Sequence, residues 1–125
     1  METEAIHLIL SKIKEGKFCL ILSPVHTQEI EAMLDEVEKI KLKTIVSDLG
    51  HKPSHNVCLP KIRQRAEELV TYGFGIADAA HVAFAEEYNA EFITCDDKLI
   101  KKCKKYGIKV WCDNPLMFCL KENLQ

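Results

Sequence analysis

Apolar residues form helical stripes in some parts of the chain and short continuous runs in others. Their alternation predicts helices separated by short strands. In residues 3–15 the positions Ile6, Ile9, Leu10 and Ile13 lie on one helical stripe, which Gly16 ends. Residues 18–22 are a continuous apolar run, typical of a strand buried on both faces. Similar runs predict strands at 91–95 and 108–111. Further helices are predicted over 76–89 and 97–106, from Ser23-Pro24, from Pro60 and from Asn114-Pro115.

The pattern between the first strand and Pro60 is weaker. A helical stripe of Ile30, Met33, Leu34 and Val37 continues the helix that begins at Ser23-Pro24. Residues 41–46 fit either the end of a helix or a short strand, and residues 51–55 are predicted to be loop. Helices that alternate with short β-type runs predict an α/β fold, with a parallel sheet covered by helices on both faces.

Composition narrows the class of protein. The 125 residues suit one domain, with 47% hydrophobic and 29% charged residues. A formal net charge of −2 excludes nucleic-acid binding by bulk charge, although a local basic patch remains compatible with it. No apolar run is long enough to cross a membrane, and the N-terminal residues lack the features of a signal peptide. The six cysteines have no metal-ligand spacing, so we expect mostly buried free thiols in a cytoplasmic protein.

Three acids fall where an α/β sheet places its functional residues, beyond the carboxyl ends of the strands. Glu29 lies in the helix after strand 18–22, Asp78 in the first turn of helix 76–89, and Asp96 directly after strand 91–95. Converging carboxylates repel one another unless a cation lies between them, and Mg²⁺ or Mn²⁺ suits oxygen ligands. Taken singly, each acid also fits a structural role, as a helix cap or a solvated helix residue.

Other polar residues near these acids are secondary candidates. His81 shares a helix face with Asp78 and is expected to be partly buried with its hydrogen bonds satisfied. Thr94 precedes Asp96 by two residues and fits a ligand contact or an ordinary strand position. His51 and His55 are expected in an exposed polar loop. A basic helix face that could hold RNA phosphates is formed by Lys98, Lys101, Lys102 and Lys105.

The sequence around the three acids resembles the PIN-domain family of metal-dependent ribonucleases. Ile21-Leu22-Ser23-Pro24-Val25 followed by Glu29 resembles the family's second-acid motif. The family's third-acid motif is resembled by Asp78-Ala79-Ala80-His81-Val82-Ala83. Its fourth-acid motif is resembled by Phe92-Ile93-Thr94-Cys95-Asp96-Asp97. The resemblance covers roughly residues 5–120, and Gly107-Ile108-Lys109-Val110 with Asn114-Pro115 is similar to the family's usual ending.

The resemblance implies a three-layer α/β/α fold with a short parallel sheet. It also implies Glu29, Asp78 and Asp96 as catalytic ligands of Mg²⁺ or Mn²⁺, and RNA as the substrate. Many family members are toxins held inactive by an antitoxin protein, and many form homo-oligomers. The chain departs from the family at its start, because no β-like run ending in Asp precedes residue 18. The expected sheet therefore has four strands, without the central first strand and its acid.

Two explanations of this departure remain open: a start placed too far along the chain, or a naturally short, degenerate member. The missing acid would weaken metal binding and activity. A missing central strand would leave unpaired backbone groups on strands 18–22 and 91–95, which the chain closes directly or pairs with a second subunit. The alternative function is a non-catalytic domain that binds RNA or protein. Another phosphoryl-transfer fold is disfavoured, because no glycine-rich phosphate loop is present.

Overall fold

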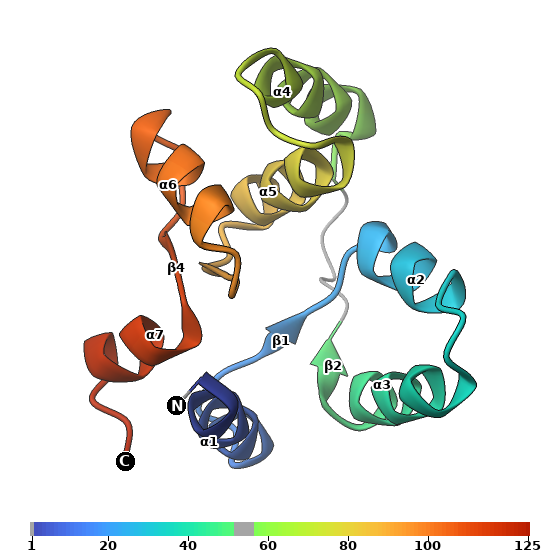
Figure 1. The fold of residues 1–125 in the computed structure, drawn as a ribbon, viewed down its shortest axis with the longest axis vertical. Helices are drawn as coiled ribbons and strands as arrows, with labels where there is room; N and C mark the ends of the chain where they lie inside the picture. The colour runs from blue at the N-terminus through green and yellow to red at the C-terminus, as the bar shows by residue number, and fades with distance from the viewer. Residues whose placement is uncertain (1, 52–56) are drawn as a thin grey trace.

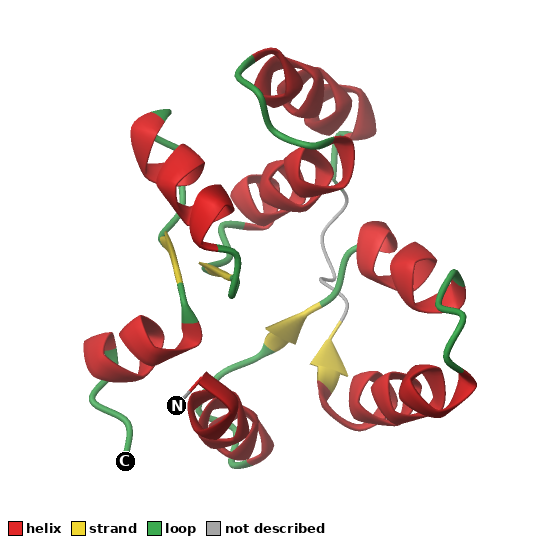
Figure 2. Ribbon diagram, in the orientation of Figure 1, coloured by secondary structure: helices red, strands yellow, loops and turns green. Residues whose placement is uncertain are grey.

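The computed structural model describes residues 2–51 and 57–125 of the chain. Helices and short parallel strands alternate, as expected for the α/β class, and helix dominates (Figures 1 and 2). The helices are α1 Glu2–Lys14, α2 Pro24–Glu31, α3 Glu36–Leu49, α4 Leu59–Thr71, α5 Ile76–Tyr88, α6 Asp97–Lys105 and α7 Pro115–Lys121. The strands are β1 Leu20–Ile21, β2 Gly50–His51, β3 Phe92–Ile93 and β4 Cys112–Asp113.

The strands pair in two separate places rather than in the one sheet expected from sequence. β1 pairs in parallel with β2, and β3 pairs in parallel with β4. Among the described residues no ladder joins the two pairs, which lie apart in Figure 1. Each strand is only two residues long, and among the described residues each pairs with a single neighbour.

The helical region after β1 differs from the sequence prediction in two places. The helix expected to continue through Leu34 and Val37 breaks, because the Asp35 carboxylate accepts the N–H groups of Val37 and Glu38 at 3.0 and 3.2 Å and starts α3. Leu34 is accordingly 96% exposed. Residues 41–46 are helical, so the strand alternative there is wrong.

The predicted strand at 108–111 and part of the predicted loop at 51–55 also need correction. The strand lies at Cys112–Asp113, because those residues align with Phe92 and Ile93 of β3. His51 belongs to β2, and His55 lies outside the described residues. Both strands were missed because a two-residue strand carries no measurable alternation of apolar and polar positions.

The helix ends lie at glycines and capping residues that are visible in the sequence. Gly16, Gly73 and Gly107 follow their helices with positive φ angles, a conformation that side chains with a Cβ rarely adopt. Asn114 caps α7 by accepting the N–H of Met117 at 2.8 Å. These caps explain why helix ends were predicted more closely than strands.

The apolar core is divided into three clusters. The largest joins α4, α5, α6 and β4 around Leu69 and Val82, neither of which is accessible to solvent. A second joins α1 to α7 around Ile9 and Phe118, and a third joins α4 to α5 around Ile62. The first and third clusters both pack against α5, which carries two of the candidate functional residues.

Three of the six free thiols are exposed, contrary to the expectation of mostly buried cysteines. Cys19, Cys58 and Cys95 are exposed, whereas Cys103, Cys112 and Cys119 are buried. The exposed three flank strands or helices rather than lying within the packed elements. Hydrogen bonding to Cys112 and burial raise the pKa of the Cys103 thiol, so this inner thiol stays protonated.

A buried ion pair ties α4 to α5, and its carboxylate also binds the segment before β4. The Glu86 side chain is 5% exposed and accepts hydrogen bonds from Arg65 Nε at 2.8 Å and from the Lys109 N–H at 2.8 Å. Burial alone raises the pKa of Glu86, but the hydrogen bonds from Arg65 and Lys109 outweigh it and hold the pKa below its usual value. The ionised form is therefore the form that stabilises the fold.

We expect Glu86→Gln to lower the free energy of unfolding by about 2 kcal/mol near neutral pH, because Arg65 loses its charged partner. The pKa of Glu86 is lower in the folded state than in the unfolded state. The stabilisation is therefore complete at pH values above the pKa of the unfolded state, and it is lost as the pH falls through the pKa of the folded state. The free energies of unfolding of the unchanged chain and of Glu86→Gln, measured with urea, should therefore converge at acid pH. Glu67→Gln is the matched control, since Glu67 pairs with Arg63 in solvent. Equal losses in the two variants would contradict the prediction.

None of the helices in the described ranges is long and apolar enough to cross a membrane.

Candidate functional site

The three predicted acids lie on elements that follow β1 and β3 or precede β3. Glu29 is exposed near the end of α2, Asp78 is half-buried in the first turn of α5, and Asp96 is exposed at the start of α6. α2 follows β1, while α6 follows β3. The position of Glu29 is therefore set by the β1–β2 pair, and the position of Asp96 by the β3–β4 pair.

Glu29 makes a contact that joins α2 to α5. Its Oε1 lies 2.6 Å from His81 Nε2, across 52 residues of sequence. His81 is three residues after Asp78, so this contact brings the Glu29 carboxylate to the helix turn next to Asp78. The hydrogen-bond partner of His81 Nε2 is thus Glu29 rather than Asp78 on its own helix.

His81 is also only half satisfied. Its Nδ1 atom is buried and has no hydrogen-bond partner among the described residues. An unpaired polar atom in a buried position costs free energy, so native structures contain few of them. The expected satisfied histidine therefore has one ring nitrogen available for a further ligand.

His26 is a neighbour that the sequence reading missed. Its ring centroid lies 4.5 Å from that of His81, and its Nδ1 accepts the N–H of Ser23 at 3.1 Å. Burial and, to a lesser degree, the neighbouring His81 ring lower the pKa of His26, and Glu29 partly opposes them. The capping pattern was visible in the sequence, because His26 is the third helical residue after the N-cap Ser23.

Asp96 has a clear structural role in the described geometry. Its Oδ1 accepts the N–H groups of Lys98 and Leu99 at 3.0 and 3.2 Å, which caps α6. The Thr94 hydroxyl accepts the Asp96 N–H at 3.2 Å, so Thr94 supports the turn that presents this carboxylate. The second carboxylate oxygen of Asp96 is not used by the cap.

Asp78 differs from the other two acids, because within the described residues its carboxylate has no hydrogen-bond or ion-pair partner. Its Oδ2 stands 3.7 Å from the point where a Cβ on Gly75 would lie. That is an ordinary contact distance, so the lack of a described partner, and not the glycine, leaves the carboxylate open at the start of α5.

A fourth acid near this edge is Asp113, which the sequence analysis did not select. It is paired in register with Ile93 and is buried. A hydrogen bond from Lys104, at 2.7 Å from Oδ2, lowers the pKa of Asp113 although burial opposes this. Its position at the carboxyl end of β4 could have been found only if that strand had been placed correctly.

The acids do not form a metal site in this arrangement. Among the described residues no three His, Cys, Asp or Glu side chains are close enough together to hold a metal ion. Glu29 is held by His81 and Asp96 by the helix cap, so a divalent ion does not fit between them as they stand. The donor chemistry suits Mg²⁺ or Mn²⁺, but the spacing does not.

The basic face of α6 is only partly available. Lys98, Lys101 and Lys105 are exposed, and Lys105 lies over the Tyr106 ring at 5.2 Å. Lys102 donates to the Gly73 carbonyl oxygen at 2.7 Å, which ties α6 to the turn between α4 and α5. Three of the four predicted phosphate contacts therefore remain directed to solvent.

Comparison with known proteins identifies the fold family. The model of the PIN domain matches residues 2–105, which is most of the chain and includes all three predicted acids. No curated protein and no solved structure matches the chain. The alternation of helices with short parallel strands agrees with this match. The chain belongs to the PIN-domain family.

Proposed function

We propose that this chain is an endoribonuclease-type PIN domain that hydrolyses RNA phosphodiesters with the help of Mg²⁺ or Mn²⁺. PIN domains are in general nucleases that depend on a divalent metal, which gives the class of activity. The proposal assigns the metal ligands to Glu29, Asp78 and Asp96, in a single PIN-like domain of α/β/α type. When bound, the metal would polarise a water and the phosphate.

The observation that carries this proposal is the match of the PIN-domain model to residues 2–105, which include all three acids. In addition, the 2.6 Å contact of Glu29 Oε1 with His81 Nε2 places Glu29 against α5, one turn from Asp78. Asp78 itself has no competing partner among the described residues. Two of the three acids are thus already directed to one region, and closer approach of the β3 side would add Asp96.

The charge around these acids supports a substrate that carries phosphate groups. Lys98, Lys101 and Lys105 are exposed on α6, which starts at Asp96. Lysines on such a face attract phosphates, and they position a strand without reading its sequence. We propose RNA as the substrate. A toxin role, an antitoxin partner, a homo-oligomer and a cytoplasmic location complete the proposal, the last supported by six free thiols.

The test is RNA cleavage by the purified chain in Mn²⁺, with an excess of chelator as the blank. We expect slow cleavage that the chelator abolishes and that Asp78→Asn lowers by about 100-fold, because a metal ligand is lost while size is kept. Glu87→Gln is the matched control, since Glu87 is a later α5 acid that pairs with Lys61. Chelator-resistant cleavage, or equal cleavage by the two variants, would reject the assignment.

A second function is favoured by the positions of the three acids, which do not come together as a metal site among the described residues. A non-catalytic domain would bind RNA through the α6 lysines without cleaving it. The same assay distinguishes the two proposals. RNA that stays bound to the chain and remains intact at every metal concentration would reject the nuclease and support the binding domain.

A further inference from the structure

Two tyrosine rings stack where the end of α4 meets the end of α6. Tyr72 follows α4 and Tyr106 follows α6, and their ring centroids lie 4.8 Å apart with an interplanar angle of 9°. Near-parallel stacking is also the way in which nucleobases bind to aromatic side chains. The two helix ends are held together by a further contact, because Lys102 of α6 donates to the Gly73 carbonyl oxygen at 2.7 Å.

One face of the Tyr72 ring is open to solvent. Tyr106 covers the other face, yet Tyr72 remains 37% exposed. The Tyr72 hydroxyl donates to Glu68 Oε1 at 3.1 Å, and Arg65 donates to the same oxygen and offsets its charge. The hydrogen bond to Glu68 raises the pKa of Tyr72, so the ring stays neutral and does not repel a phosphate. A third planar group can therefore extend the stack.

The approach to the tyrosine pair along α6 is basic. Lys105 lies over the Tyr106 ring, with its Nζ atom 5.2 Å from the ring centroid. Lys98 and Lys101 are exposed on the preceding turns of the same helix. Since residues three and four apart share a helix face, these lysines form a row that leads from Asp96 toward Tyr106. The row is about 15 Å long, at the rise of a regular helix.

We propose that the open face of Tyr72 binds a base of single-stranded RNA, while phosphates of the same strand contact Lys101 and Lys105. The strand must be unpaired, since a duplex holds the faces of its bases within its own stack. RNA as the ligand rests on the proposed function, but the stacking site does not require cleavage. In a nuclease the site holds the strand at one end of the lysine row, and Asp96 stands at the other end.

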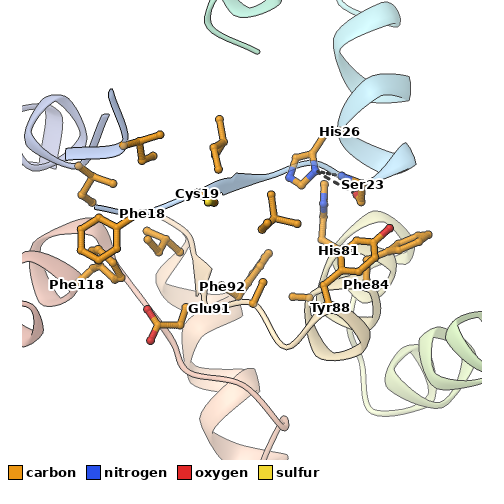
Figure 3. A pocket seen from close by; sticks show the side chains of 17 residues that line it. Phe18, Cys19, Ser23, His26, His81, Phe84, Tyr88, Glu91, Phe92 and Phe118 are labelled. Atoms are coloured by element: carbon orange, nitrogen blue, oxygen red, sulfur yellow. Dashed lines mark hydrogen bonds between the residues drawn. The ribbon is translucent and has the colours of Figure 1, made fainter. Parts of the chain in front are cut away.

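The tyrosine pair is separate from the apolar groove that lies between the two strand pairs. The groove has a volume of about 340 Å³, and Figure 3 shows the side chains that line it. Its lining includes Phe18 and Phe92 but neither Tyr72 nor Tyr106. Among the described residues no lysine or arginine lines the groove, so the side chains that neutralise phosphate charge lie elsewhere. A nucleotide is therefore expected at the tyrosines rather than in the groove.

The first test is binding of a fluorescein-labelled oligoadenylate of about eight nucleotides, followed by anisotropy in excess chelator so that metal-dependent cleavage does not occur. We expect Tyr72→Leu to raise the Kd at least tenfold, because leucine has no ring on which a base can stack. Tyr72→Phe is the matched control: it keeps the ring, loses only the hydrogen bond to Glu68, and should stay within threefold of the unchanged chain. Circular dichroism checks that both variants are folded.

Photocross-linking tests the site in the unchanged chain. The same oligonucleotide with one 5-iodouridine is irradiated in the complex, and peptide mass spectrometry identifies the ring to which it is joined. We expect the cross-link at Tyr72, with at least tenfold less product from a duplex of the same sequence. A cross-link only at another ring, such as Phe92 in the groove, would overturn the proposal, as would equal Kd values for Tyr72→Leu and Tyr72→Phe. Both readouts are taken without metal, so failure of the nuclease assignment leaves them unchanged.

Discussion

Leu69→Ala is expected to lower the free energy of unfolding by about 3–4 kcal/mol, because it leaves a cavity in the largest cluster of the core. Leu69 lies in α4 with no solvent exposure, against α5 and α6. Alanine is the better helix former, so the loss cannot come from helix propensity. In a domain whose total stability is about 5–15 kcal/mol, such a loss lowers the midpoint of thermal unfolding by roughly 10 °C.

Val70→Ala is the matched control for this prediction, since Val70 is the next residue of α4 and is 41% exposed. Its cost should stay under about 1 kcal/mol. Both variants are measured by thermal and urea unfolding followed by circular dichroism. Equal losses at the two positions would mean that α4 does not pack onto α5 and α6 as described.

Asp96→Asn is expected to lower Mn²⁺-dependent RNA cleavage by about 100-fold while leaving stability almost unchanged. Asp96 caps α6 through its Oδ1 atom, and asparagine caps a helix as well as aspartate does. The substitution therefore removes the negative charge of the proposed metal ligand and keeps the helix end. Asp96→Ala should in addition cost about 1 kcal/mol of stability, because the cap is lost.

Asp97→Asn controls for charge at this helix end, since Asp97 is the first residue of α6 and is exposed. Its cleavage rate should be close to that of the unchanged chain. If Asp96→Asn cleaves as fast as Asp97→Asn, Asp96 is a helix cap only and the proposed site loses one of its three acids.

Helix positions were predictable because their causes are local. A stripe of apolar residues with a period near 3.6, a polar cap and a glycine with positive φ are all visible within one segment, as in α1 with Gly16 and α6 with Asp96. The exception is α3, where Asp35 starts a new helix inside an apparently continuous stripe. A single capping side chain was enough to overrule the periodicity there.

Strand positions and the candidate site depended on contacts distant in sequence. β2 and the true position of β4 follow from pairing across about 30 and 20 residues, which no local pattern records. The sequence identified Glu29, Asp78 and Asp96 as candidates, but it could not show that Glu29 pairs with His81, that His26 lies beside it, or that Asp113 shares the edge. These contacts are made by residues that only packing brings together.

The sequence by itself determined the family, the helices and the three acids, because each rests on residues close together in the chain. The tertiary structure alone decided that the strands form two pairs rather than one sheet, and that an apolar groove separates them. The physical reason is that a strand is completed by hydrogen bonds to its neighbours, whereas a helix completes its own.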